Sequence, residues 1–292
     1  MIETGIFKLR DPFVLVEDGI YYVYGTDVSE GGWIDSTWCC YKGSALDGKW
    51  EKLDMIYVRP ENAEKNFWAP EVHKYKGFYY MFASYYSSVT SHRGCSILKS
   101  ESPEGPFVEI TKGHVTPSDW DAIDGTLWVD DEGQPWMVFV HEWTSTDDGI
   151  GRMAAARLSD DLTRFISEPV ELFRADDAPW ANIQVTDGCF LYKTSGGKLQ
   201  MLWSNTFDRE YRVGIAESAD GRVDGEWLQF EAPLFSKDVS GKHDGGHGMI
   251  FTAEDGKKYL SVHSPNNLEG GLSEEVVFLP IKEENGKIVC EK

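Results

Sequence analysis

Short apolar runs that alternate with turn residues make up most of the chain. Five segments share one pattern, in which an apolar run, a glycine turn and a second aromatic or aliphatic run follow one another. They are DPFVLVEDGIYYVYGT, APEVHKYKGFYYMFAS, IDGTLWVDDEGQPWMVFV, TDGCFLYKTSGGKLQMLWS and HGMIFTAEDGKKYLSVHS. Because β-branched and aromatic residues flank turn formers in each segment, we expect each one to form a β-hairpin.

The hairpins recur with a regular period. Their turn glycines, at intervals of 58, 56, 64 and 59 residues, are Gly19, Gly77, Gly133, Gly197 and Gly256. Further strand-like runs such as GCSILKSESPEGPFVEI lie between them, and no stretch keeps a helical apolar period. About four strands in each of five units predict an all-β chain, with residues 1–292 forming a single five-bladed β-propeller domain. A two-sheet sandwich is the alternative, but it would not require this fivefold period.

Composition narrows the class of ligand. The 292 residues are 41% hydrophobic, which is enough for a large core, and 28 Lys+Arg stand against 49 Asp+Glu, a net charge of −21. Nucleic acid and anionic membrane surfaces are bound through positive patches, so neither is expected as a partner. The sequence shows no signal peptide core and no run of about 18 apolar residues, which predicts a cytoplasmic location.

Ionisable residues recur at the start of the inner strand of most units. The innermost strand of a propeller blade lines the central channel, so these positions point towards the axis. Counting back from each turn glycine gives Asp11, the stretch 69–71, Asp124, Asp187 and His247. An isolated Asp before Pro or Gly often begins a turn, but separate acids already occupy the hairpin tips. We therefore expect three carboxylates and one imidazole to converge at one end of the channel.

Crowded carboxylates suit the hydrolysis of glycosidic bonds. When several share a site, one is held protonated as an acid while another stays charged as a base, and inverting glycosidases need that division. Tryptophan is frequent, with 11 residues, and sugar rings pack on aromatic faces. Four residues are expected to contact sugar: Trp68 and Glu71 at an inner strand, and Trp33 and Trp120 in loop-like sequence. Trp203, within an apolar run, is expected in the core or at the pocket floor.

Four of these segments resemble the blade signatures of glycoside hydrolase family 43. They are RDPFVLVEDGIYYVYGT, FWAPEVHKYKGFYYMFAS, AIDGTLWVDDEGQPWMVF and VTDGCFLYKTSGGKLQMLW, and they span nearly the whole chain. The resemblance implies a five-bladed propeller and inverting hydrolysis of α-L-arabinofuranosyl or β-D-xylosyl linkages with three acids. The chain ends soon after the fifth hairpin, without the extra β-sandwich of many xylosidases of this family. That favours release of arabinose from oligo- or polysaccharides of plant type.

The resemblance also implies a role for each acid. Asp11 in RDPF would be the general base, Asp124 in AIDG would position it and tune the acid, and Asp187 in TDGC would be the general acid. The family usually has Glu followed by Gly-Pro at the last motif, so Asp187 is one methylene short and Cys189 replaces the proline. The backbone could compensate, activity could be weak or directed at another substrate, or a different acid such as Glu71 could serve.

The resemblance further suggests a metal, commonly calcium, near His247 in the central channel. Calcium prefers several oxygen ligands, and the sequence shows none dedicated to it, so no cofactor is expected to be required. Four functions stay open beside arabinose release. They are a β-xylosidase of the same family, a catalytically impaired propeller that binds carbohydrate, a retaining propeller glycosidase such as a fructosidase, and a protein-interaction propeller.

Overall fold

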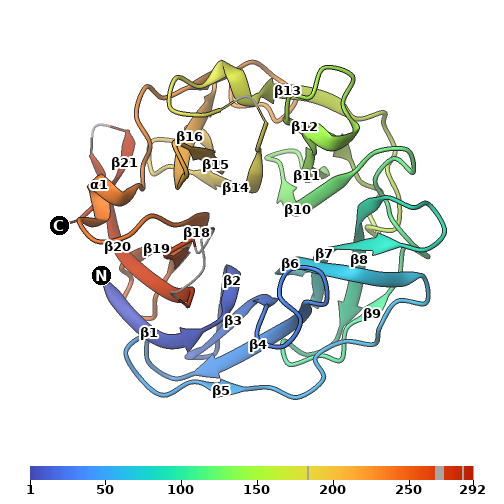
Figure 1. Cartoon of the computed structure of the whole chain (residues 1–292), viewed down its shortest axis with the longest axis horizontal. Coiled ribbons are helices and arrows are strands. Elements are labelled where there is room, and N and C mark those ends of the chain that lie inside the picture. Colours follow the sequence, from blue (N-terminus) through green and yellow to red (C-terminus); the bar gives the residue numbers. More distant parts are fainter. Residues whose placement is uncertain (183, 267–272, 285, 292) are drawn as a thin grey trace.

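The structure, a computed structural model, describes residues 1–182, 184–266, 273–284 and 286–291. These residues form five antiparallel sheets arranged around a central axis (Figure 1). Within the described part of the chain, the only α-helix is α1 (Lys237–Ser240). The predicted five-bladed β-propeller is therefore confirmed, and the two-sheet sandwich is wrong.

Consecutive strands build the blades from the axis outwards. The first blade contains β2 (Leu9–Glu17), β3 (Ile20–Asp27), β4 (Thr37–Gly43) and β5 (Glu51–Lys52). The second contains β6 (Ala63–Tyr75), β7 (Phe78–Ser87), β8 (Arg93–Ser100) and β9 (Val108–Glu109). The third contains β10 (Ala122–Val129), β11 (Pro135–His141), β12 (Arg152–Arg157) and β13 (Val170–Arg174), with two short 3-10 helices, η1 (Trp143–Ser145) and η2 (Ala175–Asp177), in its loops. The fourth contains β14 (Asp187–Lys193), β15 (Leu199–Phe207), β16 (Glu210–Ser218) and β17 (Trp227–Gln229).

The fifth blade joins the two ends of the chain. It contains β18 (Gly246–Thr252), β19 (Lys258–Ser264), β20 (Glu275–Glu284) and β21 (Lys287–Cys290), and it also takes in the N-terminal strand β1 (Ile2–Phe7). Strand β1 pairs antiparallel with β20, with Ile2 opposite Phe278. This pairing closes the ring, as Figure 1 shows where the blue and red strands meet. The hairpin repeat did not predict it, because the partner strand lies almost the whole chain away.

The five predicted hairpin turns are confirmed. They connect β2 to β3, β6 to β7, β10 to β11, β14 to β15 and β18 to β19. Each predicted turn glycine has a left-handed backbone, with φ between 78° and 83°. Glycine adopts this conformation without the steric cost that a Cβ would bring, so the periodic glycines follow from the geometry of the turns.

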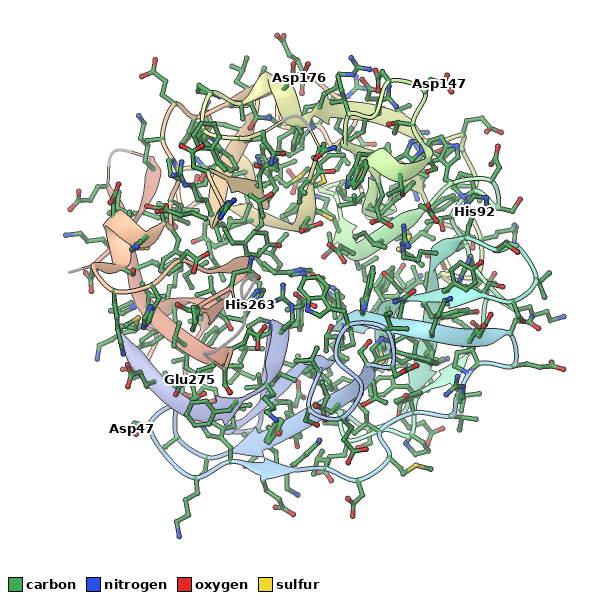
Figure 2. All side chains as sticks on the ribbon, in the orientation of Figure 1. Asp47, His92, Asp147, Asp176, His263 and Glu275 are labelled. Atoms are coloured by element: carbon green, nitrogen blue, oxygen red, sulfur yellow. The ribbon has the colours of Figure 1, made fainter. Side chains whose placement is uncertain are left out.

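The propeller has an apolar core between its blades and acidic side chains at its rim. Apolar clusters fill the space between neighbouring blades and include fully buried side chains such as Trp203 and Phe278. Figure 2 shows Asp47, Asp147 and Asp176 at the rim, whereas His263 lies near the axis. No helix in the described residues is long and apolar enough to cross a membrane. These acidic side chains at the rim are separate from the ionisable groups at the axis.

The closing strand gives a test of the fold. Ile6 on β1 is 1% exposed and packs into the core, whereas the adjacent Phe7 is 54% exposed. We expect Ile6→Ala to lower the free energy of unfolding by about 2–5 kcal/mol, because it removes buried methyl groups and leaves a cavity. Phe7→Ala, on the same strand, should change it by about 0.5 kcal/mol or less. Urea denaturation of both variants measures this; equal losses would show that β1 does not close the core as described.

Candidate active site

Each inner strand contains a bulge at the same place. The pairing register with the second strand skips two residues in every blade. The first skipped residue always has a positive φ, and the five are Asp11 (55°), Ala69 (44°), Asp124 (56°), Gly188 (58°) and His247 (50°). This conformation is uncommon for residues other than glycine and persists only where the surroundings enforce it. The bulges therefore aim three ionisable side chains at the channel mouth.

One predicted position needs correction. Asp187 was expected to occupy the same place as Asp11 and Asp124, but Gly188 occupies it. Asp187 comes one residue earlier and pairs with Ser204 before the bulge begins. A Cβ at Gly188 would lie 2.8 Å from the ring of His247, so no side chain fits there. The carboxyl group of the fourth blade therefore reaches the site from the preceding residue, where the Tyr211 hydroxyl donates a hydrogen bond to its Oδ2 atom at 2.9 Å.

Side chains on the second strand of the preceding blade hold the bulges in four of the five blades. The bulge N–H donates to a side chain on the second strand of that blade: Asp11 to His263 Nδ1 at 3.2 Å, Ala69 to Thr26 Oγ1 at 2.8 Å, Asp124 to Ser84 Oγ at 2.9 Å and His247 to Ser204 Oγ at 2.8 Å. The corresponding residue at the remaining junction is Val140, which pairs with Ile123 and offers no acceptor. There Gly188 N–H donates to Asp124 Oδ2 at 2.9 Å. The carboxylate of Asp124 thus replaces the missing hydroxyl and is fixed in place.

Asp11 is held in its charged form. Its Oδ2 atom accepts a 2.6 Å hydrogen bond from the Thr26 hydroxyl, and its Oδ1 atom lies 3.2 Å from His247 Nδ1. The Thr26 oxygen already accepts the Ala69 N–H, so its proton is directed to Asp11. Burial acts to raise the pKa of Asp11, but the charges of His247 and Arg10 and the hydrogen bond from His247 together hold it well below its usual range.

His247 carries the opposing positive charge. Burial acts to lower the pKa of its imidazole, but Asp11 and Asp124 outweigh burial and raise this pKa to about 10. Its Nδ1 atom lies 3.8 Å from Asp124 Oδ2, beyond hydrogen-bonding distance but close enough for charge attraction. His247 is therefore an imidazolium at neutral pH and sits between two carboxyl groups.

The pKa values of Asp124 and Asp187 are both raised. Burial raises the pKa of Asp124 to about 8, and repulsion from Asp187 and Asp11 adds to this against the attraction of His247. Burial also raises the pKa of Asp187, against His247 and the Tyr211 hydrogen bond. Two interacting carboxyls of this kind titrate as a pair. Both carboxyl groups are therefore shifted towards the protonated form.

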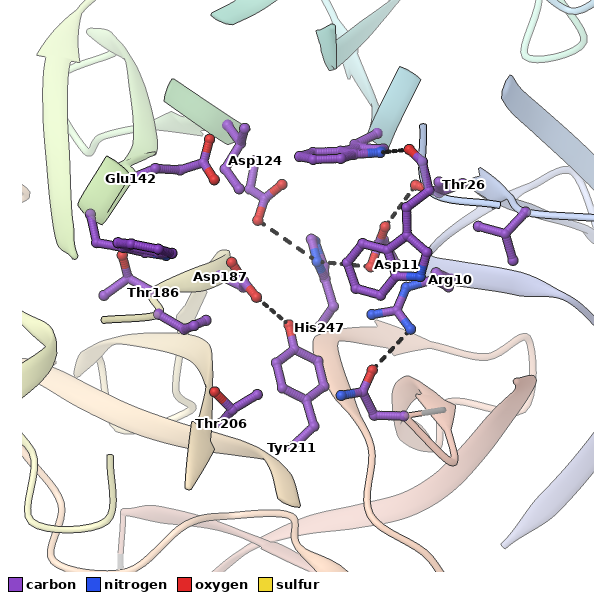
Figure 3. A pocket seen from close by; sticks show the side chains of 17 residues that line it. Arg10, Asp11, Thr26, Asp124, Glu142, Thr186, Asp187, Thr206, Tyr211 and His247 are labelled. Carbon is purple, nitrogen blue, oxygen red and sulfur yellow. Dashed lines mark hydrogen bonds and ion pairs between the residues drawn. The ribbon is translucent and has the colours of Figure 1, made fainter. Parts of the chain in front are cut away.

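These groups line one pocket of about 350 Å³ at the mouth of the channel (Figure 3). Two of the predicted sugar-contact residues, Trp33 and Trp68, line it as well. Their rings meet edge to face at 6.4 Å between centroids, and Trp68 Nε1 donates to the Trp33 carbonyl at 2.8 Å. The guanidinium of Arg10 stacks 4.0 Å from the Trp33 ring centroid. The pocket therefore joins carboxyl groups to an aromatic wall.

Three other predicted contacts do not reach the pocket. Trp203 is fully buried, where its Nε1 atom donates to Gln229. Trp120 stacks on His141 with 3.8 Å between ring centroids, so its face is covered. Glu71 follows the bulge instead of forming it and pairs with His73 at 3.0 Å. The side chains of a strand alternate between faces, and the sequence did not reveal which face Glu71 and Trp203 occupy.

Several pocket residues were missed by the sequence analysis. They are Arg10, Thr26, Glu142, Trp143, Thr186, Thr206, Tyr211 and Asn266. Arg10 directly precedes Asp11 in RDPF, and Glu142 comes two residues after the apolar run MVFV. Both therefore stand at the ends of a predicted hairpin, which is a signal that the sequence does contain. Tyr211 lies on a third strand and carries no comparable signal.

A metal near His247 stays a prediction. Its Nδ1 atom lies 3.2 Å from Asp11 Oδ1 and 3.8 Å from Asp124 Oδ2. Calcium requires several converging oxygen ligands, and the described residues contain no group of three or more His, Cys, Asp and Glu side chains that could hold an ion.

Carboxyl groups and aromatic rings lie together at the channel mouth of this propeller. That combination is typical of propellers that act on carbohydrates. The sequence model described as "Glycosyl hydrolases family 43" matches residues 5–287. The chain belongs to this family.

Relatives agree with this membership. A solved structure of an endo-arabinase from Bacteroides thetaiotaomicron VPI-5482 shares 36% identity, with a TM-score of 0.84, over 98% of this chain and 99% of that one. An extracellular exo-α-(1→5)-L-arabinofuranosidase, ArbA, from Cellvibrio japonicus (strain Ueda107) is 29% identical over 68% of this chain. That match covers 62% of the relative, which is less than two thirds of its length. A probable arabinan endo-1,5-α-L-arabinosidase C from Aspergillus niger (strain ATCC MYA-4892 / CBS 513.88 / FGSC A1513) is 27% identical over 75% of this chain and 69% of its own length.

The ion pair at the axis predicts a measurable titration. Asp11→Asn removes the charge that contributes most to raising the pKa of His247. We expect this pKa to fall from about 10 towards the ordinary histidine value of about 6.5, as read from the imidazole proton shifts by NMR. Glu132→Gln, an equivalent loss of charge at an exposed hairpin tip, should leave the His247 titration unchanged. If His247 titrated at the same pH in the Asp11→Asn variant and the native chain, the ion pair would be wrong.

Proposed function

We propose that the protein is an inverting glycosidase that releases arabinose by hydrolysing α-L-arabinofuranosyl linkages, as an arabinofuranosidase or arabinanase. The observation that carries the proposal is the arrangement of carboxyl groups in the pocket: the pKa of Asp11 is held low, whereas those of Asp124 and Asp187 are raised. The printed names of the relatives, an arabinofuranosidase and two arabinan-degrading enzymes, support arabinose as the sugar. Its partner is then an arabinose-containing oligosaccharide.

Asp11 is the general base of the proposed reaction. Its pKa is held low, so it remains ionised across the working pH range, and the Thr26 hydroxyl fixes its orientation. It takes a proton from a water molecule, whose oxygen forms a bond to the anomeric carbon of the sugar. The glycosidic bond from that carbon to the leaving oxygen breaks on the opposite face. The product sugar therefore carries the inverted configuration.

Asp187 is the general acid and donates its proton to the leaving oxygen. Burial raises its pKa and so favours the protonated form, which a general acid requires. The Tyr211 hydroxyl holds Oδ2, which leaves Oδ1 as the donor atom. The Gly188 bulge packs directly against His247, so close backbone approach offsets the shorter side chain relative to the usual Glu.

Asp124 positions the other groups in this mechanism. It lies beside both Asp187 and His247 and is locked by the Gly188 N–H. Asp124 helps to raise the pKa of His247, and the charge of His247 in turn lowers the pKa of Asp11. The proposed steps use protein side chains and water, and no cofactor is required.

The departure of Asp187 from the family pattern motivates the second candidate, a propeller that binds carbohydrate with impaired catalysis. A β-xylosidase of the same family is the alternative substrate assignment. The first candidate differs from the main proposal in the rate of hydrolysis, and the second differs in the sugar that is released. Rates measured on arabinosyl and xylosyl substrates therefore distinguish them.

Substitution of the acids tests the proposal. We expect Asp11→Asn and Asp187→Asn each to lower the rate on linear arabinan and on aryl arabinofuranosides by about 10²–10⁴-fold, since each removes a proton-transfer group. Asp124→Asn should also lower it. Asp187→Glu, which restores the usual acid, should retain hydrolysis. Assays run beside aryl xylosides, with thermal unfolding as the control for folding, measure this.

Three results would contradict the proposal. Near-native rates in all the Asn variants would remove the carboxylates from the mechanism. Inactivity of Asp187→Glu equal to that of Asp187→Asn would exclude Asp187 as the acid. Sugar binding by the native chain without turnover, unaffected by Asp11→Asn, would establish the impaired propeller instead.

A further inference from the structure

A carboxylate and an indole stand together in the pocket wall beyond the three aspartates. Glu142 directly follows β11, and Trp143 begins the short helix η1. Both line the pocket. The Glu142 side chain is 14% exposed, and Trp143 is 38% exposed. The proposed mechanism uses neither residue.

A network of contacts holds Glu142 in place. Its Oε2 atom lies 2.5 Å from Arg93 Nε, and its backbone N–H donates to the Asp121 carbonyl at 2.8 Å. The guanidinium of Arg93 also contacts Asp121 Oδ2 at 3.2 Å and the Thr144 hydroxyl at 3.2 Å. A charged side chain that is fixed from several directions pays little conformational entropy on binding a ligand.

The other carboxylate oxygen of Glu142 faces the pocket without a protein partner among the described residues. Burial raises the pKa of Glu142 to about 7, despite the opposing charge of Arg93. Buried polar groups are normally satisfied by hydrogen bonds, and ligand pockets use a few such groups to fix ligand orientation. The free Oε1 atom is therefore suited to accept a hydrogen bond from a hydroxyl group.

Glu142 lies on the side of the proposed acid. The charge of Asp187 contributes to the raised pKa of Glu142, and Figure 3 shows the carboxyl groups of Asp124, Asp187 and Glu142 on one side of His247, with Asp11 and Arg10 on the other. In an inverting reaction the acid stands beside the leaving group and the base stands beneath the sugar that is released. Glu142 is thus placed on the leaving-group side, and Trp143, the next residue in the chain, lines the same pocket.

We propose that Glu142 and Trp143 form the subsite for the sugar unit on the leaving-group side, in which Glu142 Oε1 accepts a sugar hydroxyl and Trp143 packs against a ring face. This inference rests on the proposed function, because the leaving-group side is defined by Asp187 as the acid. The ligand is the arabinose unit that follows the cleaved bond in an oligosaccharide.

Binding to a catalytically inactive chain isolates this subsite from the chemistry. In an Asp11→Asn background, arabinotriose and free arabinose are titrated by calorimetry against chains with and without Glu142→Gln. We expect Glu142→Gln to weaken arabinotriose binding about 10- to 100-fold, the range for a hydrogen bond to a charged group, and to change arabinose binding little. Glutamine can still accept the Arg93 hydrogen bond, so the fold should persist. Glu132→Gln is the matched control and should alter neither affinity.

A second variant keeps the test independent of the Arg93 network. Trp143→Ala, at a partly exposed position, should also weaken binding of arabinotriose more than binding of arabinose. Unchanged arabinotriose affinity in both variants, or equal losses for the two ligands, would overturn the subsite.

The outcomes also separate this inference from the proposed function. If the Asp11→Asn chain with Glu142 intact bound no arabinotriose but did bind xylotriose, the arabinose assignment would fail, and the same comparison with xylotriose and xylose would decide the subsite. Binding of neither trisaccharide would overturn both. A role for Glu142 as the acid would overturn the subsite too. It would appear as Glu142→Gln binding arabinotriose normally while losing hydrolysis in the chain that retains Asp11.

Discussion

The site depends on one buried positive charge among three carboxyl groups. His247 lies 3.2 Å from Asp11 and 3.8 Å from Asp124, and these neighbours keep its ring protonated. Without that charge, Asp11 would meet the same burial and repulsion that raise the pKa values of Asp124 and Asp187. A single imidazolium therefore makes three chemically similar residues unequal. That inequality is what a pair of acid and base requires, and it underlies the proposed mechanism.

The propeller supplies the geometry through a repeated backbone feature. A bulge in each inner strand directs a side chain towards the axis, and the preceding blade holds the bulge amide with a hydroxyl or imidazole in four blades. Val140 interrupts this pattern, and Asp124 takes over as the acceptor for Gly188. The same contact thus joins two blades and fixes a carboxylate. Structural and chemical roles coincide at Asp124, which explains why a carboxyl group is buried there.

Much of the fold could be predicted because its signals are local. Turn glycines and alternating apolar runs recur in each blade, and they placed Asp11, Asp124 and His247 near the axis. The position of Asp187 was wrong by one residue because a bulge leaves no pattern of its own in the sequence. Trp203 lies in the core, one of the two places predicted for it, whereas Trp120 and Glu71 were expected to contact sugar and do not line the pocket. Glu142 directly follows a second strand and Tyr211 lies on a third strand, and their approach to the site is set by blade packing over long sequence separations.

The stereochemistry of hydrolysis tests the central claim most directly. If Asp11 activates water on one face of the sugar and Asp187 protonates the leaving oxygen on the other, proton NMR of the reaction on an arabinan oligosaccharide should first show arabinose of inverted anomeric configuration. The second anomer should then grow only as mutarotation proceeds. If the first-formed arabinose retained the configuration of the substrate, a carboxylate would have to attack the sugar itself, and the assignment of Asp11 as a base that activates water would be contradicted.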